Sequence, residues 1–496
     1  MMRHSQSLKF VLRNLVEVPS VLDMQVAELS ADSRAIRPGD AFVALPDAEG
    51  DTGRYLDDAV AHGAVAVIRH VDGPAPVHEY KGTLVVPVSG LTERVAELAE
   101  LFYDYPSTRL NVIGVTGTNG KTSVTQFLTG MLNHCGQRTA SIGTLGYGFP
   151  GAMLEASHTT PDVIRVHRLL ARFLEKGAEN VVMEVSSHGL DQGRVDRVHF
   201  SGGIFTNLAR DHLDYHSSLA AYGEAKAKLF RDYGLCFAVL NGDDSFSGTL
   251  YSYIPSGARC WRYSVTGQSA EFAVVSITPA SAGFTAEVET PSGALTLESR
   301  LMGMFNLANL IAACAGCAAL GVDLEQIGEA ARAVEAPPGR METFQAADGR
   351  RLVIDYAHTA DALEAVLEAL RPHVAGQLWC VFGCGGDRDT SKRPMMGAVA
   401  ERLADQVVIT DDNPRSEAPE SIVEQILAGM NDAGAAEVEH DRARAIALAF
   451  EQSGPHDLVL VAGKGHERFQ ERQGEKLPFS DLETVRKMIA ETGGAA

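Results

Sequence analysis

A glycine-rich turn at residues 117–123, which reads Gly-Thr-Asn-Gly-Lys-Thr-Ser, constrains the fold of this chain more than any other feature. Residues 110–115 before the turn are largely apolar and predict a buried strand. After the turn, apolar residues recur at helical spacing, at Val124, Phe127, Leu128, Met131 and Leu132. A strand, a glycine turn and a helix in this order wrap backbone N–H groups around phosphate oxygens. The segment therefore predicts an α/β fold that binds a nucleoside triphosphate, which we take to be ATP.

The expected nucleotide contacts are the residues of the turn itself: Gly117, Thr118, Asn119, Gly120, Lys121, Thr122 and Ser123. Lys121 would bring a positive charge to the outer phosphates, and Thr122 would offer its hydroxyl to Mg²⁺. The common phosphate-binding string has a glycine five residues before Gly120, where this chain has Val115, so the turn is a shorter variant. A plain turn between strand and helix is the alternative, which the order of strand, loop and helix disfavours.

The length and the charge of the chain narrow the possibilities further. A chain of 496 residues with 45% hydrophobic content exceeds one core, since single cores stop growing at roughly 250–300 residues. The net charge of −21 disfavours binding to nucleic acid or to an anionic membrane. No apolar run approaches the roughly 20 residues that span a bilayer, and the N-terminus lacks the pattern of a secretory signal. We expect a cytoplasmic monomer whose anionic ligands are held by local clusters of Arg, Lys and helix N-termini.

Alternating strand and helix patterns predict three α/β domains, at residues 1–107, 108–337 and 338–496. The first is small, the second is a P-loop-like domain with a mainly parallel sheet, and the third is Rossmann-like. Residues 270–301 change to alternating Thr, Val and Glu segments, which predicts an antiparallel insertion. The predicted strands are 41–45, 64–68, 110–115, 180–185, 203–206, 238–240, 352–355, 378–382, 407–410 and 458–461.

Cys314 and Cys317 form a C-x-x-C pair inside an alanine-rich run at residues 311–320. No second Cys/His pair lies nearby at metal-ligand spacing. We therefore expect two small buried helix residues here, in preference to a redox or zinc pair.

Polar side chains follow two neighbouring predicted strands of the central region. Glu184 falls near the end of a buried strand, where a carboxylate is costly unless it binds a cation or hydrogen-bond donors. His212 follows the next predicted strand, and imidazole suits divalent metals. Metal binding and ordinary buried polar side chains both remain open for this pair. Lys226 lies in an amphipathic helix and, from the pattern alone, predicts a surface lysine.

Three polar loops follow successive strands of the last region, at residues 383–389, 410–415 and 462–467. Ligands lie at the carboxyl ends of strands in open α/β sheets. The loops combine forked Arg donors with acidic acceptors, as a zwitterion with an extra carboxylate requires, at Arg388, Arg415, Asp412 and Glu467. Ordinary turn chemistry is the alternative for each loop, but three such loops together disfavour it.

Taken together, these motifs resemble the ATP-dependent Mur ligases of peptidoglycan synthesis over essentially the whole chain. The resemblance is carried by Gly-Thr-Asn-Gly-Lys-Thr, Glu-Val-Ser-Ser-His, Arg-Asp-His-Leu-Asp-Tyr-His, Tyr-x-x-Ala-Lys, Gly-Met-Phe-Asn-Leu-Ala-Asn and Gly-Arg-Met-Glu. It implies three domains that bind UDP, ATP and an amino acid, in that order. The match is closest to members that add meso-2,6-diaminopimelate, because members that add lysine lack the Arg of Asp-Asn-Pro-Arg.

The resemblance also assigns residues to ligands. It implies that Lys226 is carbamylated and completes a metal site with Thr122, Glu184 and His212. It also implies that Lys121 acts in catalysis together with Lys226, Glu184 and His212. Further ATP contacts are Asn309, Arg340 and Asp355. The contacts of UDP-N-acetylmuramoyl-L-Ala-D-Glu are Ser33, His158, Thr159, Thr160, Ser186, Gln192 and Arg194. The diaminopimelate contacts are Arg388, Asp412, Asn413, Pro414, Arg415, Gly463 and Glu467. The loop at 46–51 departs from a string found in some relatives, so Ala48, Glu49 and Gly50 carry no assigned contact.

The implied reaction is phosphoryl transfer followed by acyl transfer. The side-chain carboxylate of D-Glu attacks the γ-phosphate of ATP, and the amine of diaminopimelate attacks the resulting acyl phosphate, while Mg²⁺ and Lys121 neutralise charge. Asp355 and His358 are further candidates to assist. A folylpolyglutamate synthase is the nearest alternative, and the N-terminal Asp-Ser-Arg region argues against it. A nucleotide-controlled binding protein is another, which the acid-and-Arg loops disfavour.

Overall fold

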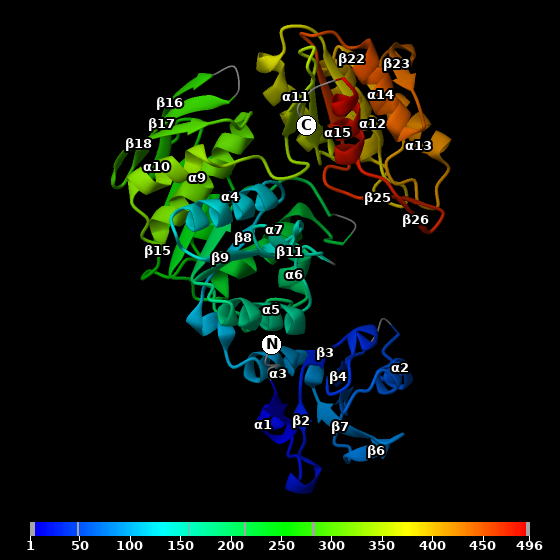
Figure 1. The fold of residues 1–496 in the computed structure, drawn as a ribbon. Helices are drawn as coiled ribbons and strands as arrows, with labels where there is room; N and C mark the ends of the chain where they lie inside the picture. The colour runs from blue at the N-terminus through cyan, green and yellow to red at the C-terminus, as the bar shows by residue number, and fades with distance from the viewer. Residues whose placement is uncertain (1–4, 47–48, 157, 213–214, 280–282, 493–496) are drawn as a thin grey trace.

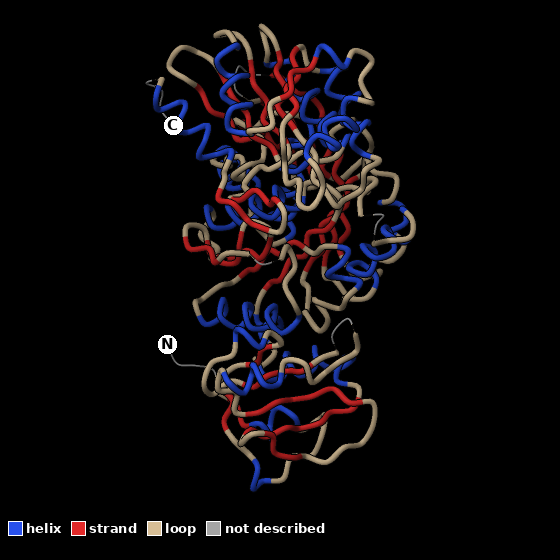
Figure 2. The backbone as a smooth tube through the Cα atoms, turned by 90° about the vertical axis from the view of Figure 1, so that its right-hand side faces the viewer, coloured by secondary structure: helices blue, strands red, loops and turns tan. Residues whose placement is uncertain are grey.

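The computed structural model describes residues 5–46, 49–156, 158–212, 215–279 and 283–492, and Ala48 therefore lies outside the described residues. Three sheets with their helices follow one another along the chain (Figure 1). They are stacked along one axis, with the N-terminal part at one end and the C-terminal part at the other. The view turned by 90° shows the same succession (Figure 2).

The N-terminal part is built on a five-stranded sheet of order β3-β4-β5-β7-β6, parallel except for its last strand. Its core is made by alternate apolar residues of these strands and by the buried face of one long helix. The strands are β3 Leu29–Ser30, β4 Ala41–Ala44, β5 Ala66–Val71, β6 His78–Tyr80 and β7 Thr83–Ser89, and the helices are α1 Leu8–Leu12, α2 Leu56–Ala61 and α3 Leu91–Phe102. A separate pair, β1 Gln6–Ser7 and β2 Gln25–Val26, lies beside them.

An eleven-stranded sheet of order β11-β10-β9-β12-β8-β13-β14-β15-β16-β17-β18 forms the central part. Its seven middle strands, from β9 to β16, are parallel, and the two ends are antiparallel. The parallel strands are β8 Asn111–Thr116, β9 Thr139–Gly143, β12 Asn180–Glu184, β13 Gly202–Phe205, β14 Phe237–Asn241, β15 Arg259–Ser264 and β16 Phe272–Pro279. The others are β10 Gly146–Phe149, β11 Ala152–Leu154, β17 Phe284–Thr290 and β18 Gly293–Ser299.

Helices cover both faces of the central sheet because its strands are apolar on both sides. Ile113 and Val115 of β8 face one core, while Val112 faces the other. The first core is closed by α4 Lys121–His134, α9 Met304–Ala319 and α10 Leu324–Arg332, and the second by α5 Val163–Glu175 and α7 Leu219–Arg231. Two short helices, α6 Ser187–Asp191 and α8 Ser247–Tyr251, complete this part.

The C-terminal part has a six-stranded sheet of order β19-β20-β24-β21-β22-β23, parallel except for β19. Two helices cover one face and three cover the other. The strands are β19 Glu342–Gln345, β20 Arg351–Asp355, β21 Leu378–Phe382, β22 Gln406–Ile409, β23 Ala436–Val438 and β24 Leu458–Ala462. The helices are α11 Ala360–Leu370, α12 Lys392–Leu403, α13 Pro419–Leu427, α14 Arg442–Gln452 and α15 Asp481–Glu491. A hairpin, β25 Phe469–Arg472 and β26 Glu475–Pro478, projects after β24.

The α/β prediction is confirmed, and each predicted strand has a counterpart whose ends differ by up to three residues. The predicted antiparallel segment at 270–301 exists as β16, β17 and β18, but it is not a separate insertion. β16 pairs with β15 in parallel, so the segment extends the central sheet. Cys314 and Cys317 are buried in α9, as predicted for small helix residues.

A fully buried ion pair joins the two helices on one face of the C-terminal sheet. Arg442, at the start of α14, donates to both carboxylate oxygens of Asp481, at the start of α15, at 2.8 Å each. The same guanidinium donates to the carbonyl of Ala462, the last residue of β24, at 2.9 Å. The pair therefore ties both helix starts to the strand end that carries the loop at 463–467.

Replacing Arg442 with Met leaves the Asp481 carboxylate buried without its partner, so we expect the free energy of unfolding to fall by about 3–5 kcal/mol. Urea unfolding followed by the fluorescence of Trp379, in a Trp261→Phe background, measures this for the C-terminal part. The double replacement Arg442→Met/Asp481→Leu should recover most of the loss. Arg444→Met, an exposed site on the same helix, should stay within about 0.5 kcal/mol of the parent. A single variant as stable as the parent would contradict the assignment.

Candidate active site

The glycine turn leaves the carboxyl end of β8 and enters α4, as predicted. Gly117 and Gly120 have φ values of +148° and +83°, a region that favours glycine. A Cβ at Gly117 would overlap the hydroxyl of Thr206, and one at Gly120 would overlap the amide of Asn309. No side chain caps the start of α4, whereas Asp162 caps α5 and Ser218 caps α7. The first N–H groups of α4 are therefore left for an anionic ligand.

Residues after β13 hold the turn in shape. Thr118 N donates to the carbonyl of Asn207 at 2.8 Å, and Asn119 N donates to the Asn207 side chain at 3.0 Å. Thr206 Oγ1 donates to the carbonyl of Asn119 at 2.5 Å. Ala209 N donates to Thr118 Oγ1 at 2.9 Å. Because β13 is the neighbour of β8 in the sheet, these bonds fix the turn against an adjacent strand end.

Two lysines converge on the first carbonyl of the turn. Lys121 Nζ donates to Gly117 O at 2.9 Å and to Thr118 O at 2.8 Å, and Lys226 Nζ donates to Gly117 O at 2.8 Å. Burial lowers the pKa of Lys121, and burial together with the charge of Lys121 lowers the pKa of Lys226 well below its usual value. Lys226 is 1% exposed, so its prediction as a surface lysine from the helical pattern was wrong. A buried amine with a lowered pKa is the nucleophilic form that carbamylation requires.

Glu184, at the end of β12, is buried and fully engaged with its neighbours. Its two carboxylate oxygens accept from Thr122 Oγ1 at 3.0 Å, Thr144 N at 2.8 Å and Thr144 Oγ1 at 3.1 Å. Thr144 Oγ1 also lies 3.1 Å from Thr159 Oγ1. A Cβ at Gly143 would overlap the Glu184 carboxylate, so glycine is required beside it. The carboxylate thus joins the glycine turn to the loop that carries Thr159.

His212 lies in a cluster of rings beside these groups. Its ring is 4.9 Å from that of His188 and 6.2 Å from that of Tyr222, between ring centres. Tyr222 shares α7 with Lys226, whose ammonium lies 4.1 Å from the Tyr222 ring centre. Of the four predicted metal ligands, the structure brings Thr122 and Glu184 into direct contact. Lys226 contacts the first carbonyl of the turn, and the His212 ring lies near Tyr222, which shares α7 with Lys226.

Among the described residues, no group of three His, Cys, Asp or Glu side chains is arranged to hold a metal ion. The predicted set contains only two such side chains, Glu184 and His212. Mg²⁺ keeps several waters and binds through one or two carboxylates plus substrate phosphates. The donor set therefore fits Mg²⁺ only together with the nucleotide and a modified lysine.

The residues predicted to bind the UDP-dipeptide fall into two places. Thr160 Oγ1 donates to the carbonyl of Glu184 at 2.9 Å, and Ser186 caps α6 by accepting from Gly189 N at 3.0 Å. Arg194 donates to Thr160 O at 2.9 Å and to the Gln192 amide at 2.6 and 3.0 Å.

His158 and Ser33 are the other residues predicted to bind the UDP-dipeptide. The Tyr147 hydroxyl donates to the carbonyl of His158 at 2.5 Å and accepts from His158 N at 3.1 Å. Ser33 lies apart, buried in a short helical turn of the N-terminal part, Ser33–Ala35, beside the Asp32–Arg34 ion pair.

The remaining predicted ATP contacts lie where the central and C-terminal parts meet. Asn309 of α9 is buried against Gly120. Arg340 stacks on the ring of Tyr356, 4.4 Å from its centre. Asp355, at the end of β20, accepts from Met341 N at 2.9 Å and Ala357 N at 2.8 Å, and burial raises its pKa. Burial lowers the pKa of His358, which favours a neutral imidazole.

Most residues predicted to bind diaminopimelate gather at the carboxyl ends of β22 and β24. Asn413 donates to Glu467 Oε2 at 3.0 Å. Arg415, with a φ of +53°, donates to Gly386 O at 2.6 Å and to Glu471 Oε2 at 3.3 Å. A Cβ at Gly463 would lie 2.7 Å from Asp412 Oδ2, which places these two residues together. The carbonyl of Pro414 lies against Gly386, and Arg388 lies near Gly385 in the same group of loops.

Four supporting residues were missed from the sequence. Thr144 and Asn207 follow strand ends, where a polar residue is itself a signal, but their targets depend on strand order. Lys464 and Glu471 contact the Asn413 side chain and Arg415. Lys464 lies between two glycines in Gly-Lys-Gly, a pattern that is typical of a turn.

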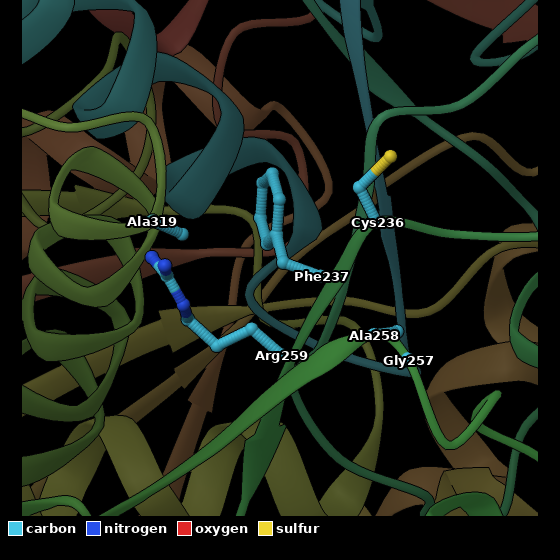
Figure 3. A pocket seen from close by; sticks show the side chains of 6 residues that line it. All are labelled: Cys236, Phe237, Gly257, Ala258, Arg259 and Ala319. Atoms are coloured by element: carbon cyan, nitrogen blue, oxygen red, sulfur yellow. The ribbon is translucent and has the colours of Figure 1, made fainter.

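A pocket of about 380 Å³ lies at the opposite ends of the strands from this site. It is lined by Cys236, Phe237, Gly257, Ala258, Arg259 and Ala319, which precede or begin β14 and β15 or end α9. Figure 3 shows the Arg259 side chain extending toward Ala319. Since the polar groups described above lie at the carboxyl ends of these strands, this pocket takes no part in the candidate active site.

Comparison with known proteins identifies the family of this chain. Residues 115–317 match the Mur ligase middle domain, and residues 339–465 match the glutamate ligase domain of Mur ligases. The chain belongs to the Mur ligase family. A relative from Ectopseudomonas mendocina, named UDP-N-acetylmuramoyl-L-alanyl-D-glutamate--2,6-diaminopimelate ligase, is 47% identical over 94% of this Mur ligase and 95% of its own length. A relative of the same name from Vibrio vulnificus is 40% identical over 98% and 99% of the two chains.

Solved structures agree with this membership. A structure titled as a UDP-N-acetylmuramoyl-L-alanyl-D-glutamate--2,6-diaminopimelate ligase is 35% identical and covers 99% of this Mur ligase, with a TM-score of 0.69. A Mycobacterium tuberculosis folylpolyglutamate synthase shares the fold, at 20% identity and a TM-score of 0.63. It covers 74% of this chain but 91% of its own, so a quarter of this Mur ligase has no counterpart there.

Replacing Gly117 with Ala places a methyl group against the Thr206 hydroxyl, so we expect the Kd for ATP to rise at least about tenfold. Isothermal titration with Mg·ATP measures it. Gly130→Ala, in the helix α4 that follows the turn and with nothing within 4 Å of the added Cβ, is the matched control. It should leave the Kd unchanged and stabilise α4 by about 0.5–1 kcal/mol. Equal affinity in the two variants would argue against the turn as the phosphate site.

Proposed function

We propose that this Mur ligase joins meso-2,6-diaminopimelate to the D-Glu side-chain carboxylate of UDP-N-acetylmuramoyl-L-Ala-D-Glu, with cleavage of ATP to ADP and phosphate. The observation that carries the proposal is the cluster of Asn413, Arg415 and Glu467 at the strand ends of the C-terminal sheet. It combines an acid for an ammonium group with a forked cation for a carboxylate. The names of full-length relatives at 40% and 47% identity support the same substrate.

The arrangement of the chain supports a reaction in two steps. An oxygen of the D-Glu carboxylate attacks the γ-phosphorus of ATP, the bond to the bridging oxygen breaks, and ADP leaves. The amine nitrogen of diaminopimelate then attacks the acyl carbon and loses a proton, and phosphate leaves as the amide forms. The turn and Lys121 bind and neutralise the phosphates, so positioning and electrostatics carry the rate without a protein nucleophile.

Mg²⁺ is proposed as the resident cation of this site. Thr122, Glu184, His212 and a carbamylated Lys226 would hold it together with the nucleotide. When bound, it would neutralise charge on the phosphates that are transferred and released. Burial of Lys226 and the contact between Thr122 and Glu184 are the features of the chain that favour it.

The proposed domains are residues 1–107 for UDP, 108–337 for ATP and 338–496 for the amino acid. Ser33 lies in the first, the glycine turn in the second and Arg415 in the third, so three substrates must be brought together by domain closure before chemistry. No helix within the described residues is both long and apolar enough to span a bilayer. We propose a cytoplasmic monomer, in keeping with the use of ATP and a UDP-linked substrate.

The alternatives differ in what they require of the chain. If the chain were a folylpolyglutamate synthase, its N-terminal part, which contains Ser33, would have no substrate to bind. A nucleotide-controlled binding protein would not need the acid-and-Arg cluster. Phosphate release that depends on both the UDP-dipeptide and an amino acid separates the proposed ligase from both.

Selectivity for diaminopimelate over lysine tests the role of Arg415. With the UDP-dipeptide and Mg·ATP, we expect phosphate release to require diaminopimelate, because lysine lacks the distal carboxylate. Arg415→Ala should lower kcat/KM for diaminopimelate by about 30-fold or more, the cost of leaving a charge unpaired. Arg388→Ala should show how far a second Arg contributes. Equal turnover of diaminopimelate and lysine by the unmodified chain would refute the selectivity.

Replacement of Lys226 tests the carbamate. Lys226→Ala removes the proposed ligand, so we expect kcat to fall about 10–100-fold or more. Added acetate should restore part of the activity by occupying the vacated ligand position. Lys228→Ala, at a lysine on the same helix whose side chain is 32% exposed, is the control and should remain active. Full activity of Lys226→Ala without acetate would exclude a metal-binding carbamate at this position.

A further inference from the structure

Lys464 is buried beneath the amino-acid loops of the C-terminal part. It follows β24 in the turn at 463–467, and its side chain is 0% exposed. Gly463 and Gly465 on either side have φ values of +114° and +51°. A Cβ at Gly465 would lie 2.7 Å from the carbonyl of Gly339 and 2.9 Å from Tyr356 Cβ, so the turn is closely packed. An ionised lysine is almost never fully buried unless it is paired, so its partners define its role.

The partners of Lys464 are two side chains proposed to contact the amino acid. Its ammonium donates to Glu467 Oε2 at 2.7 Å and to Asn413 Oδ1 at 3.0 Å. Asn413 Nδ2 donates to the same Glu467 oxygen at 3.0 Å. Glu471 N donates to Asn413 Oδ1 at 2.9 Å, which fixes the orientation of the amide. The three side chains form a closed triangle of hydrogen bonds.

This triangle treats the two oxygens of Glu467 differently. Oε2 accepts from both Lys464 and Asn413, whereas no described residue donates to Oε1. The Glu467 side chain is 22% exposed, while that of Lys464 is wholly covered. One oxygen is therefore held by the protein and the other remains available to a ligand.

We propose that Lys464 is a positioning residue for the amino-acid substrate. It holds Glu467 by one oxygen so that the other receives the ammonium group of the incoming amino acid. The inference rests on the proposed function and adds a residue that touches neither the nucleotide nor the reacting atoms.

The charge of Lys464 matters as well as its hydrogen bonds. Asp412 is buried beside Gly463, so two carboxylates adjoin the same turn. The two carboxylates also lie near Tyr356, whose pKa burial raises to about 12 with their help. The ammonium of Lys464, which pairs with Glu467 at 2.7 Å, offsets part of this negative charge. An apolar residue in its place would fill the space without this effect.

Steady-state phosphate release by the full chain tests the proposal, with each of the three substrates varied in turn. Lys464→Met should raise the KM for diaminopimelate at least about tenfold, because Glu467 loses its buried partner. The KM values for ATP and the UDP-dipeptide should change less than about twofold. Lys464→Gln retains an N–H donor and should recover part of the loss. Lys476→Met is the matched control and should behave as the parent. Lys476 is an exposed lysine on β26, and its ammonium lies 4.5 Å from the centre of the Phe469 ring, which is 6.0 Å from that of Lys464.

Thermal unfolding separates positioning from general stability. Glu467 is 22% exposed and can be hydrated when it loses its partner, so the Tm of Lys464→Met should fall by no more than about 2–4 °C. An unchanged KM for diaminopimelate, or an equal rise for all three substrates with a larger fall in Tm, would overturn the role of Lys464. If the parent itself releases no phosphate in the presence of diaminopimelate, the proposed function is what fails.

Discussion

The hydrogen bonds between the glycine turn and the segment after β13 are the contacts on which the rest of the site depends. They set the backbone of Thr118 and Asn119 against a neighbouring strand end before any ligand arrives. With the turn in place, the start of α4 is uncapped, Thr122 reaches Glu184, and the first carbonyl receives both lysines. A site organised in this way pays little reorganisation energy when phosphates bind, which is the condition for electrostatic catalysis.

Much of the architecture followed from pattern alone. Apolar strands in alternation with amphipathic helices require a parallel sheet covered on both faces, so the class of fold and the main apolar strands could be predicted. Short or marginal strands such as β10, β11 and β23 could not. The extent of the central sheet could not, because the residues at 270–301 alternate in the same way whether they form a separate unit or continue an edge. Only the pairing of β15 with β16 decides between the two.

Some residues of the candidate site could likewise be predicted from sequence, and others could not. Glycines, Glu184 and the loops of the last region stand at strand ends, and sequence places them correctly because strand ends converge. Lys226 was misjudged, since its depth depends on how α7 lies against the glycine turn. Lys464 was overlooked because flanking glycines resemble an ordinary turn. What a side chain contacts across the sheet depends on the order of the strands, and that order cannot be predicted from the residues next to it in the sequence.

The two edge strands of the central sheet, β11 and β18, are each protected from further pairing. An open sheet has two edges, and an edge with unpaired N–H and C=O groups can recruit a strand from another molecule. One edge here, β11, has only three residues. The other, β18, packs under α10, where Glu298 pairs with Arg332 at 3.2 Å and alternate residues face solvent. A long, mainly parallel sheet with the glycine turn near its centre is thus finished at both sides in ways that resist edge-to-edge aggregation.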